Sequence, residues 1–152
     1  EGDISPEKVA YVTKKLVDIG AEHIGVADTI GVGTPLKVQK ALDASLRYID
    51  IDNISGHFHD TYGQALSNTL AALQMGVWQF DTSVAGLGGC PYAKGATGNV
   101  ATEDVVYMLQ GMGIDTGIDL EKLVNVGQKV SDFLGRQNGS NVARAILNKR
   151  HS

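Results

Sequence analysis

The chain has 152 residues, 43% hydrophobic and 20% charged, which is an ordinary composition for one globular domain. A formal net charge of −4 and the lack of a basic run argue against a nucleic-acid partner. We expect no membrane partner and no signal peptide, because no apolar stretch is long enough to cross a bilayer. The single cysteine cannot form an internal disulfide, which fits a reducing compartment.

The first third of the chain predicts a helix, a strand and a second helix. Ser5 has the character of a helix N-cap and is followed by proline, while Gly20 is a suitable C-cap, so a helix is expected between them. Residues 23–28 have the pattern of a short buried strand. A second helix is expected to begin at Thr34 and to continue to about residue 49.

Strands and helices continue to alternate along the rest of the chain. Further strands are predicted over 53–59 and 77–84, helices over 61–76, 101–113, 119–134 and 140–147, and a faint strand over 94–99. This alternation, with no hairpin turn signal, predicts βαβ units and a parallel sheet. Three or four units are too few for a closed (β/α)₈ barrel of about 250 residues. The sequence therefore predicts either a small open α/β sheet or the back half of a barrel.

Side chains of the types that take part in catalysis or metal binding lie where the predicted strands end. Parallel α/β sheets and barrels place their active sites at the carboxyl ends of their strands. The residues at these positions are Asp28 after the first strand, His57 and His59 at the second, Cys90 after the third, and Asn99 and Glu103 where a fourth would meet its helix.

The segment His57-Phe58-His59 places two imidazoles together. Residues i and i+2 of a strand point to the same face, so the histidines project together and Phe58 points to the helix layer. Two such imidazoles are either ligands of a metal site or a hydrogen-bonded polar pair. Asn99 adds an amide oxygen to that site or serves as a helix N-cap. Imidazole, amide and carboxylate ligands favour Mg²⁺ or Mn²⁺ over structural zinc.

The only cysteine lies in a glycine-rich segment. The stretch SVAGLGGCPYAKGATGN, residues 83–99, holds Cys90 and five glycines. A thiol here is either a small buried hydrophobe or a general acid on a mobile loop above a metal. Asp28 equally fits an Asx-type turn, and Glu103 equally fits the first turn of a helix.

Residues 83–99 closely resemble the signature loop of the 3-hydroxy-3-methylglutaryl-CoA lyase family. ADTIGVGTP, GHFHDTYGQALSNTLAALQMG and NVATEDVVYMLQGMGI resemble the same family in the same order, over residues 5–134. The His-X-His-Asp element is shared with a wider superfamily of metal-dependent aldolases and synthases. The resemblance implies a divalent-metal-dependent (β/α)₈ barrel that cleaves 3-hydroxy-3-methylglutaryl-CoA to acetyl-CoA and acetoacetate, in leucine degradation and ketone body formation.

The resemblance also implies roles for individual residues. It assigns the metal to His57, His59 and Asn99, and catalysis to Cys90, His57, Asp28 and Glu103. It implies an acyl-CoA substrate, a homodimer, and a location in the bacterial cytoplasm or the mitochondrial matrix of a eukaryote.

One part of the family pattern has no counterpart in this sequence. The family's fourth metal ligand (an aspartate), a substrate-binding arginine and a further glutamate belong to the first half of the barrel. The resemblance therefore implies that residues 1–118 are units 5–8 of the barrel, beginning with the helix before strand 5, and that 119–152 are a helical extension. The missing N-terminal half is an expected partner, without which we expect no activity. Two alternatives stay open: a non-catalytic, self-associating half-barrel, and a related metal-dependent aldolase or acyl-CoA synthase.

Overall fold

The computed structural model describes residues 2–89, 95 and 97–150. The chain forms two compact units. The first comprises Glu1–Asp81 and Cys90–Thr97, and the second comprises Thr82–Gly89 and Gly98–Ser152. In the described part of the chain, no helix has the length and apolar character needed to span a membrane.

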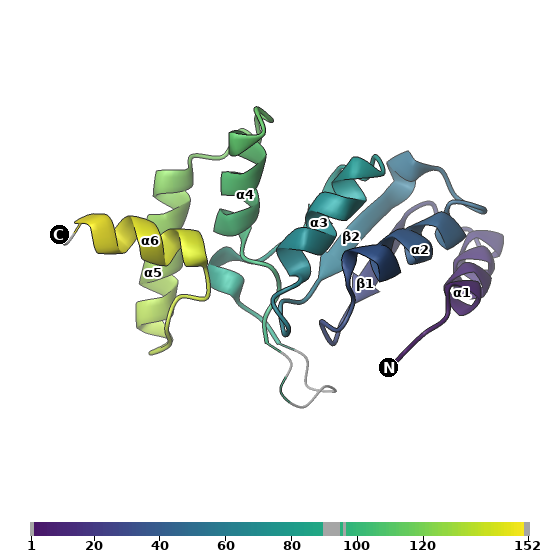
Figure 1. The fold of residues 1–152 in the computed structure, drawn as a ribbon, viewed down its shortest axis with the longest axis horizontal. Coiled ribbons are helices and arrows are strands. Elements are labelled where there is room, and N and C mark those ends of the chain that lie inside the picture. Colours follow the sequence, from purple (N-terminus) through teal and green to yellow (C-terminus); the bar gives the residue numbers. More distant parts are fainter. Residues whose placement is uncertain (1, 90–94, 96, 151–152) are drawn as a thin grey trace. The chain divides into compact units, whose positions relative to one another are not determined.

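The first unit is a parallel sheet with accompanying helices (Figure 1). Its elements are α1 (Pro6–Asp18), β1 (Ile24–Asp28), α2 (Pro35–Ser45), the 3₁₀ turn η1 (Ile51–Asn53), β2 (Ile54–Phe58), α3 (Ala65–Gln74) and β3 (Gln79–Asp81). The strand order is β1-β2-β3, and all pairs are parallel. Helix α2 contacts both α1 and α3. The predicted α/β fold with a parallel sheet is confirmed.

Local side-chain bonds determine where the helices of this unit begin. The Ser5 hydroxyl accepts a bond from the backbone N–H of Lys8 at 3.4 Å, so Ser5 is the predicted N-cap of α1. Helix α3 begins four residues later than predicted, because Asp60 holds a turn in front of it. The Asp60 carboxylate accepts from the N–H of Ala65 at 2.9 Å, and its carbonyl accepts from Gly63 at 3.0 Å.

The core of the first unit lies between the sheet and α2. It is made by alternate strand residues and by apolar residues of the helix, namely Ile24, Val26, Ile54, Phe58, Val38 and Leu42. Phe58 is only 1% exposed and points to this layer, as predicted. The opposite strand residues Ala27, His57 and Asp81 lie in register across the sheet. They are therefore directed to its other face.

Helix α1 leaves its apolar stripe exposed. Val12, Leu16 and Ile19 remain exposed, whereas Ala10 and Thr13 are buried. The Thr13 hydroxyl lies 3.2 Å from that of Ser45 in α2, which places the packed face of α1 to one side of the stripe.

The second unit is helical. It contains the 3₁₀ turn η2 (Val84–Gly86), α4 (Thr102–Gly111), α5 (Leu120–Phe133) and α6 (Asn141–Arg150). The strand predicted over 77–84 is shorter in the structure, Gln79–Asp81. Beyond it, Ser83 makes an isolated parallel bridge to Ala101, with its N–H bonded to the carbonyl of Val100, and η2 follows. The faint strand predicted over 94–99 falls partly outside the described residues. Asp104 of α4 caps α6, accepting from the N–H of Val142 at 2.9 Å.

Candidate functional site

The two histidines of the His-X-His segment lie side by side at the carboxyl end of β2. His57 is within the strand, and His59 continues its pairing by donating its backbone N–H to the carbonyl of Asp28, 3.2 Å away. The ring centroids are 5.4 Å apart and the ring planes are tilted by 33°. The predicted common projection of the two imidazoles is confirmed.

Both imidazoles use Nδ1 for a hydrogen bond within the unit. Nδ1 of His59 lies 3.1 Å from the carbonyl oxygen of Thr97, which can only accept, so Nδ1 carries the proton and Nε2 keeps its lone pair. Nδ1 of His57 lies 3.2 Å from Oδ2 of Asp81, which favours the same arrangement. Metal-binding histidines characteristically donate their second N–H to a carbonyl or carboxylate. The pair is therefore prepared to bind a cation through Nε2.

Asn99, in the second unit, has a side-chain oxygen that lacks a hydrogen-bond partner among the described residues. Its Nδ2 donates to the carbonyl of Leu87 at 3.1 Å, and its backbone N–H donates to the same carbonyl at 3.3 Å. Its Oδ1 is buried and accepts no hydrogen bond from any described residue. An unsatisfied buried acceptor costs about 1–3 kcal/mol, which a bound cation would offset. The N-cap interpretation of Asn99 is wrong, because α4 begins at Thr102 and its cap residue is Ala101.

The donor chemistry of His57, His59 and Asn99 fits a divalent cation. Two imidazole nitrogens and one amide oxygen suit Mn²⁺ and Mg²⁺ when further oxygen ligands complete the shell. Among the described residues, no cluster of three or more His, Cys, Asp or Glu side chains is arranged to hold a metal ion.

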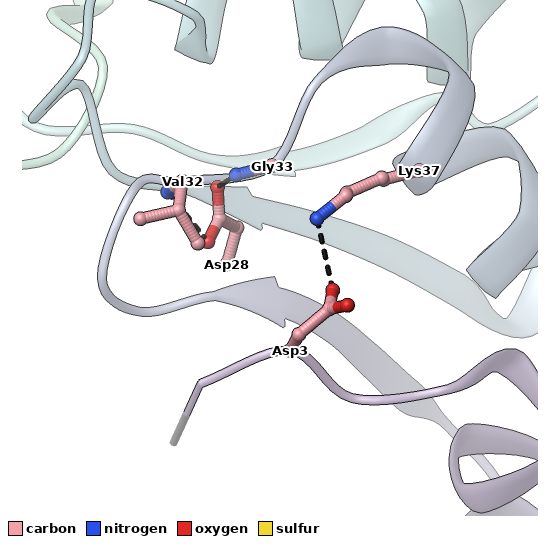
Figure 2. Close-up of polar contacts among 5 residues, drawn as sticks. All are labelled: Asp3, Asp28, Val32, Gly33 and Lys37. Atoms are coloured by element: carbon pink, nitrogen blue, oxygen red, sulfur yellow. Dashed lines mark hydrogen bonds and ion pairs between the residues drawn. The ribbon is translucent and has the colours of Figure 1, made fainter.

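Asp28 organises the loop that follows β1 (Figure 2). One carboxylate oxygen accepts from the N–H of Val32 at 3.2 Å, and the other accepts from the N–H of Gly33 at 2.7 Å. A Cβ atom on Gly33 would lie 2.8 Å from Oδ2, so glycine is needed for this approach. Asp28 therefore holds this loop, but through N–H groups four and five residues along the chain and not through the N–H two residues along that the predicted Asx-type turn would use. Figure 2 also shows Lys37 paired with Asp3. The ammonium nitrogen and the carboxylate oxygen are 2.8 Å apart, and both residues line, together with Asp28, a cavity of about 140 Å³.

Glu103 is a buried carboxyl group in the first turn of α4, as expected for a first-turn residue. Both carboxylate oxygens lie 3.0 Å from the backbone N–H of Ala85, and no basic side chain of the described residues pairs with it. Burial raises the pKa of Glu103, although the hydrogen bond from Ala85 partly opposes that shift. The Glu103 side chain therefore fixes the backbone at Ala85, although burying its carboxyl group costs solvation free energy.

Two groups near the predicted site were not found from the sequence, and one predicted residue is not described. Asp81 ends β3 in register with His57, and its position at the carboxyl end of a strand was the available signal. Ala85 has a left-handed backbone with φ of 54°, for which an alanine gives no signal. Cys90 lies outside the described residues, so its role remains a prediction.

Sequence comparison relates the chain to known proteins. A model of the HMGL-like family matches residues 1–130. The mitochondrial hydroxymethylglutaryl-CoA lyase of Arabidopsis thaliana is 57% identical over 150 residues, which cover 99% of this chain and 32% of the relative. The chain spans between a third and a half of the length of the curated relatives it matches.

Solved structures agree with the sequence comparison. The crystal structure of hydroxymethylglutaryl-CoA lyase from Pseudomonas aeruginosa matches with a TM-score of 0.91 and 50% identity, over 98% of this chain and 50% of that one. An HMG-CoA lyase from Acinetobacter baumannii, in complex with coenzyme A and 3-methylmalate, matches with a TM-score of 0.90 and 39% identity, over 95% of this chain and 48% of that one.

Proposed function

This chain belongs to the HMGL-like family, and we propose that it forms the carboxyl-terminal half of the (β/α)₈ barrel of a hydroxymethylglutaryl-CoA lyase. The observation that carries the proposal is the identity, over nearly the whole chain, with relatives named as that lyase. The parallel βα units of the first unit are the repeat from which such a barrel is built. The whole protein would cleave 3-hydroxy-3-methylglutaryl-CoA to acetyl-CoA and acetoacetate.

In this proposal His57, His59 and Asn99 hold Mg²⁺ or Mn²⁺. Support comes from the Nδ1 bonds of both histidines and from Oδ1 of Asn99, which is buried and has no partner among the residues that the structure describes. When bound, the cation would supply Lewis-acid stabilisation of the alkoxide that forms from the substrate's tertiary hydroxyl. The first half of the barrel would supply the remaining ligands.

The reaction requires one proton to leave oxygen and one to reach carbon. Loss of the hydroxyl proton lets the alkoxide become the ketone of acetoacetate as the carbon–carbon bond breaks. The electron pair of that bond passes to the acetyl-CoA enolate, whose carbon must then be protonated. We assign the first transfer to His57. Its Nδ1 already donates to Asp81, so it would accept the proton at Nε2 and only while that nitrogen is not bound to the cation. We assign the second transfer to the thiol of Cys90.

Asp28 and Glu103 serve the site as positioning residues in this proposal. Asp28 holds the loop after β1, and its carbonyl receives the backbone N–H of His59. Glu103 holds the backbone of Ala85 at the base of the glycine-rich loop.

The proposal also covers the architecture and the setting of the whole protein. Residues 1–118 belong to the barrel and 119–152 to a helical extension. The sheet edge at β1 would continue into the other half of the barrel. The complete enzyme would be a homodimer that binds acyl-CoA, in the bacterial cytoplasm or, for a eukaryotic protein, the mitochondrial matrix.

A chimaera tests the activity directly. The chain is fused behind the amino-terminal half of the Arabidopsis lyase, and acetoacetate release from 3-hydroxy-3-methylglutaryl-CoA is measured with Mg²⁺. We expect turnover in the chimaera, none in the 152-residue chain alone, and loss of turnover in His59→Ala. The matched control is His23→Ala, an exposed histidine whose loss should leave the rate unchanged. A folded chimaera that releases no acetoacetate would refute the proposed activity. Turnover by the chain alone would refute the proposal that activity requires the amino-terminal half of the barrel.

A further inference from the structure

We propose that Gly139, in the connection between α5 and α6, is a positioning residue for Asn99 and acts through the backbone of Ala85. The inference rests on the proposed role of Asn99 as a metal ligand. It extends the site to the helical segment that follows α4, where the resemblance assigns no functional residue. All of the residues involved lie in the second unit.

Ala85 is held from both sides in a conformation that alanine rarely adopts. Its φ of 54° and ψ of 22° lie in the left-handed region, at a cost of about 1–3 kcal/mol. Its N–H donates to the carboxylate of Glu103 at 3.0 Å, and its carbonyl accepts from the N–H of Gly139 at 3.0 Å. We call Glu103, Gly139 and the intervening Gly127 the Ala85 clamp.

Both glycines of the Ala85 clamp are there because a side chain would not fit. A Cβ atom on Gly139 would lie 2.7 Å from the carbonyl oxygen of Ala85, which is backbone and cannot move alone. A Cβ atom on Gly127 would overlap Oε1 of Glu103. Gly127 lies inside α5, where glycine is about 1 kcal/mol less favourable than alanine. Helix α5 therefore gives up stability to leave room for the Glu103 carboxylate.

The conformation of Ala85 determines the position of Asn99. Ala85 lies within η2, whose turn is closed by the N–H of Gly86 to Ser83 and by the N–H of Leu87 to Val84. The carbonyl of Leu87 then receives both the backbone N–H and the side-chain Nδ2 of Asn99. A displacement of Ala85 would therefore move the carbonyl of Leu87, which orients the Asn99 amide, and would turn the buried Oδ1 of that amide with it.

The test uses two glycine variants and one control in the 152-residue chain. Gly139→Ala pushes on the carbonyl of Ala85, and Gly127→Ala displaces the Glu103 carboxylate from its N–H. Gly111→Ala is the control, because that glycine lies in α4 with open space around its Cβ position. Heteronuclear NMR follows the backbone amide of Ala85 and the side-chain amide of Asn99, while Mn²⁺ affinity is measured by electron paramagnetic resonance.

We expect both clamp variants to shift the NMR signals of Ala85 and Asn99 together. We also expect them to weaken Mn²⁺ binding by about 10-fold or more, as the loss of a group that orients a metal ligand does. The control should change neither. If Gly139→Ala does not fold, Gly127→Ala still provides the test. Its new Cβ atom would meet only side-chain atoms, those of Glu103, Val84 and Asn138, and no backbone. An Asn99 signal that stays in place, whether or not that of Ala85 moves, would overturn the inference. Absence of Mn²⁺ binding in the unmodified chain would count against the proposed metal site alone, because the NMR signals still decide the positioning.

Discussion

Replacing Asp28 by asparagine removes one acceptor from the loop after β1. The carboxylate accepts from the N–H of Gly33 at 2.7 Å and from that of Val32 at 3.2 Å. An asparagine side chain keeps one oxygen and turns an NH₂ group toward the other N–H. Two donors would then face each other, and the loop must move.

The expected cost follows from these two bonds. A hydrogen bond to a charged group contributes about 1.5–3 kcal/mol, and one between neutral groups contributes about 0.5–1.5 kcal/mol. Asp28→Asn loses one charged bond and converts the other to a neutral one, but the loop is partly exposed and water replaces some of the loss. We expect the free energy of unfolding of the first unit to fall by about 2 kcal/mol.

Urea unfolding followed by tryptophan fluorescence measures this cost, because Trp78 is the only tryptophan and lies in the first unit. With a slope of about 2 kcal/mol per molar urea, the midpoint should fall by about 1 M. Asp43→Asn, an exposed carboxylate in α2, is the matched control and should change stability by less than about 0.5 kcal/mol. A change for Asp28→Asn as small as the control's would refute the view that its carboxylate holds the loop.

Three further predictions address the site. Asp81→Asn leaves the His57 ring without a charged acceptor and should weaken Mn²⁺ binding by about 10–100-fold. Asp43→Asn is the control, and unchanged affinity in Asp81→Asn would contradict the role of Asp81. Burial raises the pKa of Glu103 in the folded chain, so the folded state binds the carboxyl proton more tightly than the unfolded state does. The free energy of unfolding should therefore fall as the pH rises from the ordinary carboxyl range through the raised pKa. Glu103→Gln should flatten that slope above the ordinary carboxyl range in thermal melts of the chain, and an unchanged slope would contradict the prediction. Cys90→Ala in the chimaera should abolish most acetoacetate release while Mn²⁺ affinity stays the same, and full turnover would remove the thiol from the reaction.

The helices and the parallel sheet were predictable because their signals are local. A serine before a proline caps α1 as expected, and the alternation of apolar strands with helices predicts the parallel pairing. The errors lie at boundaries that depend on distant partners. Strand β3 ends at Asp81, and Ser83 beyond it forms an isolated bridge with Ala101, eighteen positions along the chain. No pattern near residue 83 carries that information.

The candidate site divides in the same way. The common direction of His57 and His59 follows from the two-residue period of a strand, and the structure confirms it. The Nδ1 partners, Asp81 and the carbonyl of Thr97, come from elsewhere in the fold. An acidic residue at the end of the next strand was a usable signal for the first partner. A backbone carbonyl offers none, because every residue has one.

The glycines of this chain illustrate why composition alone misleads about motion. Their clustering at the ends of elements suggests tight and flexible loops. Gly33, Gly127 and Gly139 have ordinary backbone angles, yet a Cβ atom on each would strike an oxygen of Asp28, Glu103 or Ala85. These glycines allow close approach rather than unusual dihedral angles. An alanine at any of the three would disturb a hydrogen bond made by Asp28, Glu103 or Ala85, so these glycines are explained by close contacts and not by a need for flexibility.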